Sequence, residues 1–526
     1  MHTKTANRII SSVILFAWMF GICFMRNSSP AKSAVIALVA TLIWFGLTFL
    51  PNLSLCKSIC NLNQKIWNKT DEIISEATLF FNIWLISFFV FILAWLAFFP
   101  GILGYDTPLQ YAMYLGKVPF DSAQQPILHT LFIGSLITLG HALFHSYNAG
   151  LAIVTAIQGL FITHCIASIC IFLKRRMVSP LIILAGLVLT FLNPFIQVLN
   201  CNITKDVLFG VFLTEFVMAY LDLAEDNSRK GSLIKTIIFG ILLCLFRNGL
   251  VHAVFVMLIV ALIARQKKKQ LYIALVSVIA VVHLFSFVAD SAFGIKKSPL
   301  REFLAVPIQQ LTHVVTASEA GADVVITDDE KNTFYAFIPE YGRLSEVYES
   351  DTADGPKALV NDDYLRGHLS EFLKLYFSVG LKNTADYVQT WRILEASYFD
   401  INDSEYKQLM LFRPISEYLS IDEYDFKSID TPLKKYKKYL SEKIDIDIPI
   451  VFEPIVSFTV LGLLFAAVIA FGKRKTVAVI FLLLTYLAGI LAGPVALVRY
   501  AYPLMLMLPL LIGLFTNSFK NEENLP

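Results

Sequence analysis

Two carboxylates at the ends of apolar stretches, Asp106 and Asp206, are the first candidates for chemistry in this sequence. Asp106 follows the apolar stretch 79–99, with Tyr105 directly before it, and Asp206 opens an apolar stretch after a short polar turn. At a membrane surface, two such carboxylates can divide the work of a transfer, one deprotonating or orienting an acceptor and the other holding a partner group. The structural alternatives are that Asp106 caps a helix starting at Thr107 and that Asp206 complements a helix dipole.

Three cations accompany these carboxylates at the ends of predicted spans. Lys205 adjoins Asp206, Arg247 lies in a two-residue break between apolar stretches, and Arg499 begins the last one. Arginine can bind a phosphate or pyrophosphate with two parallel hydrogen bonds. An interfacial anchor is the alternative for Arg499, whereas a basic residue outside the cytoplasm, as Arg247 would be, runs against the usual charge distribution of membrane proteins.

The composition is that of a polytopic membrane protein. Of 526 residues, 56% are apolar and only 16% are charged, and the net charge is +2. No basic, aromatic-interleaved face, P-loop or dinucleotide glycine fingerprint is present, so we expect no nucleic-acid partner. The seven cysteines form no CxxC pair and no zinc-ligand spacing. The sequence neither requires nor excludes a divalent metal, and it indicates no certain cofactor.

Twelve apolar stretches fit the length rule of roughly 20 residues for each transmembrane helix. They are residues 7–25, 33–50, 79–99, 149–173, 177–199, 206–223, 232–246, 249–264, 271–289, 455–471, 476–492 and 498–515. The first has a basic end and is long for a signal peptide, so we interpret it as a retained span.

The apolar stretch 127–144 is predicted to lie along the membrane interface rather than to cross it. Counting it as a span would place Lys174-Arg175-Arg176 outside, whereas leaving it out places all basic clusters in the cytoplasm. Those clusters are residues 57–69, 174–176, 229–230, 265–269 and 473–475. Both termini are then cytoplasmic, and Asp106, Asp206, Arg247 and Arg499 share the outer face of the cell membrane.

The polar segment 291–450 is predicted to form a mostly helical extracytoplasmic domain before the last three spans. Helices are expected at 363–379 and 383–394, with a loop-rich stretch at 327–356. The whole chain thus divides into 1–78 (two spans and a cytoplasmic loop), 79–290 (a membrane core with a first outer loop at 100–148), 291–450, and 451–526 (three spans).

The order of these features resembles the GT-C class of membrane glycosyltransferases, which includes the protein O-mannosyltransferases and lipid A aminoarabinose transferases. In that class an aspartate of the first outer loop is catalytic, which corresponds to Asp106, and a second aspartate opening a span corresponds to Asp206. A His-Pro-Pro-Leu stretch resembles residues 125–128, and a late Arg-Tyr resembles Arg499-Tyr500. The sequence departs from the class at Thr107, where many relatives have glutamate, and at Gln125, where they have histidine.

The resemblance, which covers mainly residues 79–223 and the last span, implies an all-α inverting glycosyltransferase of a bacterial branch. It would take a sugar from a polyprenyl-phosphate carrier and pass it to a glycan, lipid or protein acceptor of the cell envelope. Asp106 and Asp206 would be catalytic, and substrate would bind at Tyr105, Gln125, His129, Lys205, Arg247, Arg499 and Tyr500. The competing hypotheses are a transporter or flippase of lipid-linked saccharides, which would favour midplane sites and internal repeats, and a structural partner in envelope synthesis.

Overall fold

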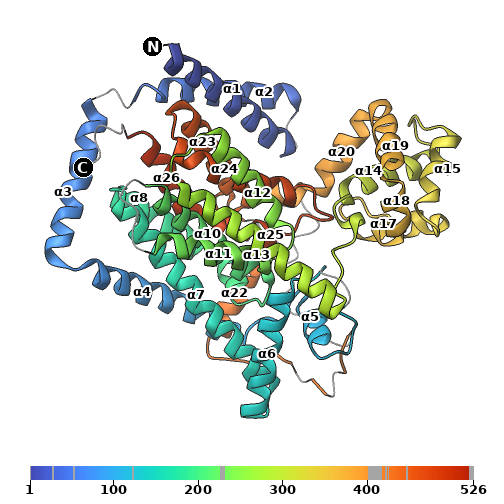
Figure 1. Cartoon of the computed structure of the whole chain (residues 1–526), viewed down its shortest axis with the longest axis horizontal. Helices are drawn as coiled ribbons and strands as arrows, with labels where there is room; N and C mark the ends of the chain where they lie inside the picture. The colour runs from blue at the N-terminus through green and yellow to red at the C-terminus, as the bar shows by residue number, and fades with distance from the viewer. Residues whose placement is uncertain are drawn as a thin grey trace.

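The computed structural model shows an all-α polytopic membrane protein (Figure 1). It describes residues 2–26, 29–50, 54–120, 124–225, 231–400, 418–420, 423–424, 426–445 and 448–520. Within these ranges, extended backbone pairs only in isolated bridges. The apolar helices form the main body, and a smaller helical unit projects from one side (Figure 1).

In the described part of the chain, seven helices are long and apolar enough to cross a membrane, or up to nine if each bent helix pair is one span. The seven are α1 (His2–Met25), α2 (Pro30–Leu47), α4 (Glu76–Ala97), α6 (Ile127–Phe144), α7 (Tyr147–Arg175), α10 (Lys205–Ala224) and α13 (Lys269–Phe293). The bent pairs are α8 (Pro180–Leu192) with α9 (Pro194–Asn200), at 67°, and α25 (Val498–Leu506) with α26 (Leu508–Ser518), at 48°.

Four shorter helices lie at the remaining predicted spans, and the first three of them are apolar. They are α11 (Ser232–Phe246), α12 (Leu250–Ile263), α23 (Pro454–Ala470) and α24 (Arg474–Ile490). The count of twelve therefore exceeds the number of helices that qualify by their own length, although a helix lies at each predicted position. The predicted cytoplasmic loop 57–69 lies within a helix, α3 (Ser54–Ile73). Its Trp67 indole donates to the Val178 carbonyl at 2.7 Å.

Three of the predicted basic clusters meet at one end of the bundle. Lys520 Nζ donates to the Arg176 carbonyl at 2.7 Å, and Lys473 Nζ donates to the Lys520 carbonyl at 2.8 Å. Gln266 Nε2 donates to the Arg474 carbonyl at 3.0 Å. These bonds join the loops 174–176, 265–269 and 473–475, which we call the basic end. The cluster 229–230 lies outside the described residues.

Helix α6 qualifies as a span by length and hydropathy, but it packs only along the first part of α7. Glycines set this close approach, because a Cβ on Gly140 would lie 2.2 Å from the Gly150 Cα and one on Gly150 would lie 2.6 Å from the Ile137 Cα. From Gln158 to Lys174, α7 continues for 16 residues, about 24 Å, towards the basic end. The part of α7 beside α6 is therefore its N-terminal part, and the rest of α7 packs in the main body with α4 and α10.

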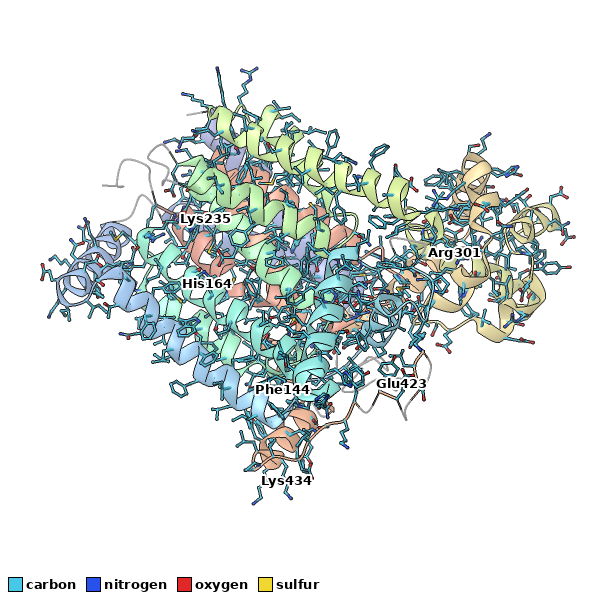
Figure 2. The ribbon with its side chains drawn as sticks, turned by 60° about the horizontal axis from the view of Figure 1, so that its bottom comes forward. Phe144, His164, Lys235, Arg301, Glu423 and Lys434 are labelled. Carbon is cyan, nitrogen blue, oxygen red and sulfur yellow. The ribbon has the colours of Figure 1, made fainter. Side chains whose placement is uncertain are left out.

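The projecting unit has a hydrophobic core of its own. It contains η2 (Leu300–Glu302), α14 (Ala305–Glu319), α15 (Asp328–Ala336), η3 (Tyr341–Arg343), α16 (Leu344–Val347), α17 (Asp354–Leu359), α18 (Asp362–Gly367), α19 (Leu369–Lys382) and α20 (Thr384–Leu394). Figure 2 shows Arg301 where the unit joins the end of α13. A short helix, α21 (Ala396–Phe399), returns the chain to the main body, and α22 (Lys434–Asp445) precedes α23.

Two predictions inside this unit were wrong, whereas the helix predicted at 383–394 is present as α20. The predicted helix 363–379 is split between α18 and α19 at His368. The stretch 327–356 is largely helical, since Thr327 and Glu330 form a reciprocal capping box that begins α15. This stretch supplies Phe334, Phe337, Ile338 and Leu344 to the core. Deleting it would hollow out the unit, so a deletion cannot separate acceptor use from folding.

Candidate active site

The loops that carry Asp106 and Asp206 are joined by a parallel β-bridge between Ile102 and Asn202. The Ile102 amide donates to the Cys201 carbonyl at 2.8 Å, and the Ile203 amide donates to the Ile102 carbonyl at 3.0 Å. Gln158 of α7 ties the second loop down by donating to the carbonyls of Asn200 and Asn202, both at 3.0 Å. Residues about 100 positions apart are thereby fixed beside one another by backbone bonds.

Glycine is required where the first loop leaves α4. Gly101 has φ +135°, a conformation open mainly to glycine, and a Cβ there would lie 2.4 Å from the Thr155 Cγ2. The Thr155 hydroxyl donates to the Pro100 carbonyl at 2.8 Å. Tyr105 also has a positive φ of 54°, a rare conformation for a bulky side chain. The loop therefore holds an unusual backbone path directly before Asp106.

Asp106 pairs with cations from two other elements and does not cap the helix that follows it. Its Oδ2 lies 3.2 Å from Lys205 Nζ and 3.4 Å from Arg499 NH2. Asp106 precedes α5 (Thr107–Tyr114), yet its side chain makes no capping hydrogen bond. The structure thus excludes the capping alternative and leaves this carboxylate for another role.

Asp206 is fully buried in an ion pair with Arg247. Its Oδ1 accepts a hydrogen bond from the Arg247 guanidinium, and its Oδ2 lies 3.1 Å from the Thr204 hydroxyl and 3.6 Å from Arg499 NH1. The side chain is 0% exposed. A buried carboxylate must be paired and hydrogen-bonded because removing it from water is costly. Arg247 and Arg499 therefore satisfy Asp206 as well as placing positive charge beside it.

Arg499 connects the two carboxylates and lies between two aromatic rings. Its guanidinium carbon lies 4.2 Å from the Tyr105 ring centroid and 4.7 Å from that of Tyr500, and NH2 donates to the Tyr500 hydroxyl at 3.0 Å. Rings in this position stabilise a guanidinium and fix its plane. Arg499 is only 5% exposed. Arg499 is therefore a buried cation with a fixed orientation, which does not fit the alternative of an anchor at the membrane interface.

Gln125 belongs to the same cluster, whereas His129 lies behind it. Lys205 Nζ donates to Gln125 Oε1 at 3.1 Å. His129 shares a hydrogen bond of 3.1 Å between its Nδ1 and Gln110 Oε1, and its ring packs edge-on against Phe246. Its Nε2 has no hydrogen-bond partner. The structure thus brings the predicted residues together around Asp106 and Asp206, except that His129 makes no direct contact with either carboxylate.

The cluster formed by Asp106, Asp206, Lys205, Arg247 and Arg499 has one more cation than carboxylates. Asp106 has the most exposed side chain of the five, at 26%, whereas Lys205 is 15% and Arg247 17% exposed. An anion would therefore be attracted to the cluster, and Asp106 is the carboxylate that a substrate could reach. Among the described residues, no group of three or more His, Cys, Asp or Glu side chains could hold a metal ion.

Beside the predicted Tyr500, sequence reasoning missed three aromatic residues around Arg247, namely Phe209, Tyr486 and Tyr398. The ring centroids of Phe209, Tyr486 and Tyr500 lie 5.4, 5.5 and 5.1 Å from its guanidinium carbon. The Tyr486 hydroxyl donates to the Tyr500 carbonyl. Tyr398 of α21 is fully buried on the same side and interacts electrostatically with Arg247. Phe209 and Tyr486 lie inside apolar stretches and Tyr398 lies in the polar segment 291–450, so neither charge nor periodicity could single them out.

Glu395, at the start of α21, is a fully buried carboxyl group whose two oxygens have no hydrogen-bond partner. Burial raises the pKa of Glu395 well above its usual range. The folded state then holds this proton at pH values where the unfolded chain has lost it. The contribution of Glu395 to the free energy of unfolding is largest below pH about 4.3, the pKa of glutamate in an unfolded chain. Above that pH it decreases by about 1.4 kcal/mol for each pH unit, until the pH reaches the pKa of Glu395 in the folded protein.

Replacing Glu395 by glutamine is therefore expected to raise the melting temperature at pH 8 and to flatten its decline between pH 5 and pH 8. The measurement is thermal unfolding of the detergent-purified proteins across that range. Glu346→Gln is the matched control, since the Glu346 side chain is 71% exposed. Parallel pH profiles for Glu395→Gln and the wild type would contradict this account.

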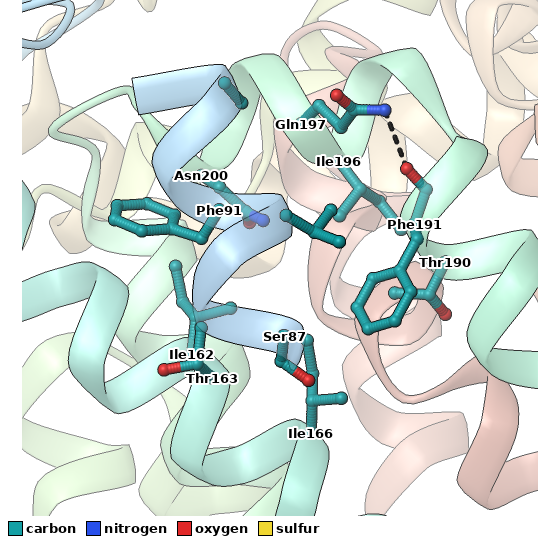
Figure 3. Close-up of a pocket in the computed structure, with 12 residues that line it drawn as sticks. Ser87, Phe91, Ile162, Thr163, Ile166, Thr190, Phe191, Ile196, Gln197 and Asn200 are labelled. Atoms are coloured by element: carbon teal, nitrogen blue, oxygen red, sulfur yellow. Dashed lines mark hydrogen bonds between the residues drawn. The ribbon is translucent and has the colours of Figure 1, made fainter. Parts of the chain in front are cut away.

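A separate cavity between α4, α7, α8 and α9 is too small for a substrate (Figure 3). It is lined mainly by apolar side chains, with Thr190, Gln197 and Asn200 among the polar ones. Gln197 Nε2 donates to the Phe191 carbonyl at 2.6 Å across its edge. Its volume of about 20 Å³ has room for about one water molecule. The ion cluster is therefore the stronger site candidate.

Residues 120–524 match a family of unknown function, DUF6020. The match spans most of the chain, which belongs to this family. It includes Gln125, Asp206, Arg247 and Arg499 and begins after Asp106. No curated protein and no solved structure matches the chain.

Proposed function

We propose that this DUF6020 protein is a membrane-embedded inverting glycosyltransferase, which moves a sugar from a polyprenyl-phosphate-linked donor to a cell-envelope acceptor. The carrying observation is the convergence of two carboxylates and three cations from four separate chain segments on one buried cluster. Its excess positive charge suits a phosphate, and its most exposed member is a carboxylate. The resemblance of the residue order to the GT-C class supports the same reading.

The donor phosphate would bind to Arg499, Lys205 and Arg247. Arginine donors hold phosphate oxygens in a planar fork, and a dry site strengthens the attraction. Arg499 is already oriented by Tyr105 and Tyr500, so little side-chain freedom is lost when phosphate binds. Negative charge that develops on the leaving phosphate would be stabilised by the same cations.

Asp106 would accept the proton of the acceptor hydroxyl, or orient that hydroxyl for attack. As the acceptor oxygen bonds to the anomeric carbon, the bond from that carbon to the phosphate oxygen breaks. The electron pair leaves on polyprenyl phosphate, and attack from the opposite side inverts the anomeric centre. Asp206, fully buried behind Arg247, would hold the donor-binding cation in place.

The site is proposed to face outward, with both termini in the cytoplasm. The helix ends that form it are the C-termini of α4 and α11 and the N-termini of α10 and α25. The basic end lies at the opposite ends of α7 and α10, where Arg176 pairs with Asp222 at 2.9 Å. Because basic loops favour the cytoplasm, this opposition supports an outward site and an α6 that lies at the outer interface.

We expect a cysteine at Ser345 to react with an impermeant thiol reagent in intact cells, and one at Lys267 to react only after the cells are permeabilised. Both positions are exposed and belong to opposite predicted faces. Lys267 is chosen rather than Lys268 because the Lys268 Nζ is buried. Ser122 and Ser404, two other positions on the predicted outer face, lie outside the described residues. The background protein should lack its seven native cysteines. Labelling of Lys267→Cys in intact cells would show that the protein has the opposite orientation in the membrane.

The donor assignment is tested by thermal stabilisation of the purified protein. A ligand that binds only the folded state raises the melting temperature. Polyprenyl phosphate should stabilise the wild type, whereas the matching polyprenol, without phosphate, should not. Arg499→Ala should lose the difference between the two lipids. Equal stabilisation by phosphate and alcohol would remove the ion cluster from donor binding.

A further inference from the structure

A groove of about 530 Å³ lies between α12, α13 and the segment that leads into the projecting unit. Its walls include Val251 of α12, and Val282 and Phe287 of α13, with Phe303 at the start of the unit. Phe287 is 67% exposed and Phe303 is 56% exposed. Val251, Val282 and Phe287 belong to apolar helices, so a lipid beside α12 and α13 could enter the groove from that side.

Polar side chains run along the inside of this groove. His252 of α12, and His283, Ser286 and Asp290 of α13, all line it and are exposed. Polar groups inside membrane spans are costly, and those that persist face a water-filled cavity or a polar ligand. A groove with an apolar wall and a row of polar side chains is better suited to bind an amphiphile than to bind a uniformly apolar chain.

Cations mark the rim of the groove beside the projecting unit. Lys296 and Lys297 are exposed there, next to Arg366. Arg366 is fixed by Asp362, which accepts from its Nε at 2.7 Å, and by the Ser298 carbonyl at 3.0 Å. This second set of cations is separate from the buried cluster, and it is placed to meet the anionic head group of a lipid.

Two residues that line the groove are close in sequence to the ion cluster. Asn248 and Ile127 line it, and Asn248 directly follows Arg247, which pairs with Asp206. The Asn248 side chain lies 3.5 Å from the Gln124 carbonyl. The next residue, Gln125, binds the lysine that pairs with Asp106. A head group in the groove thus lies next to the two segments that flank both carboxylates.

We propose that this groove binds the acceptor, and that the acceptor is an anionic phospholipid whose head group carries a hydroxyl. This inference rests on the proposed function. The buried cations already account for the donor phosphate, so a second set at the groove rim indicates a second anionic amphiphile. Its hydroxyl would reach Asp106 past Asn248, while its acyl chains lie against the apolar wall.

Photo-cross-linking tests the occupant of the groove directly. Phe287→p-benzoylphenylalanine places the reactive group in the groove, and Phe81→p-benzoylphenylalanine on α4, 53% exposed outside the groove, is the control. In proteoliposomes of phosphatidylglycerol and phosphatidylcholine, the groove probe should capture phosphatidylglycerol at least fivefold more than the control probe does. Equal capture at both positions, or preferential capture of added polyprenyl phosphate, would overturn the assignment.

Kinetics tests its role as acceptor site. Lys296→Ala/Lys297→Ala should raise KM for phosphatidylglycerol at least tenfold and leave KM for the polyprenyl-phosphate sugar within twofold. Lys434→Ala/Lys435→Ala, on exposed positions of α22, should change neither. A rise in the donor KM instead, or transfer only to a peptide or glycan, would contradict the proposal. If the groove captures phosphatidylglycerol but no donor is ever cleaved, the proposed function fails while the groove remains a lipid site.

Discussion

Replacing Asp106 by asparagine is expected to slow sugar transfer at least about 100-fold, with folding and donor binding retained. Asparagine keeps the size of the side chain but removes its negative charge and its basicity. Asp106 makes no capping hydrogen bond, and Arg499 keeps Asp206 as a carboxylate partner at 3.6 Å when the Asp106 charge is removed. The loss should therefore appear in kcat rather than in the melting temperature or in the affinity for donor.

The measurement compares wild type and Asp106→Asn for transfer from a lipid-linked donor, together with melting temperature and donor affinity. Gln124→Ala serves as the control in the same region, since the Gln124 side chain lies against Glu302 of the projecting unit, 3.4 Å from Nε2 to Oε1. If Asp106→Asn transferred sugar at a near-normal rate, Asp106 would lose its catalytic assignment and Asp206 would be tested next.

Replacing Arg247 by alanine is expected to destabilise the protein by about 3 kcal/mol and to weaken donor binding at least tenfold. The stability loss arises because Asp206, at 0% exposure, would keep its buried charge without its closest partner. Arg247→Lys keeps the charge but loses the planar fork, so its effect on donor affinity should be smaller. Unfolding by SDS in mixed micelles measures the stability, and donor titration measures the affinity.

A double variant separates the two effects. Arg247→Ala/Asp206→Asn removes both charges of the pair, so most of the lost stability should return. Donor affinity should stay low, because a phosphate-binding cation is still missing. Recovery of both stability and donor affinity in the double variant would show that Arg247 only neutralises Asp206.

The sequence alone was sufficient to predict which charged residues would meet. Asp106, Asp206, Arg247 and Arg499 each stand at the end of an apolar stretch, where a charged side chain is conspicuous. The alternation of spans places such ends on common faces. What the sequence could not predict is the pairing, because the bridge between Ile102 and Asn202 is made by backbone atoms of two ordinary loops.

Local signals were harder to interpret in the projecting unit. The stretch 327–356 contains prolines and glycines and was predicted as loop-rich, although Thr327 and Glu330 have the spacing of a capping box. The break at His368 contains no proline, and its only sequence signal is Gly367, the last residue of α18. Glu395 lies in a polar segment, so its complete burial depends on tertiary packing.

The central claim is that the cluster around Asp106 and Asp206 breaks the bond between a sugar and its lipid phosphate. It is tested most directly by incubating the purified protein in detergent with a polyprenyl phosphosugar and phosphatidylglycerol, and measuring free polyprenyl phosphate. We predict release by the wild type and at least about 100-fold slower release by Asp106→Asn. An intact donor in the detergent assay, combined with its movement across the bilayer in proteoliposomes, would contradict the enzyme and establish a flippase.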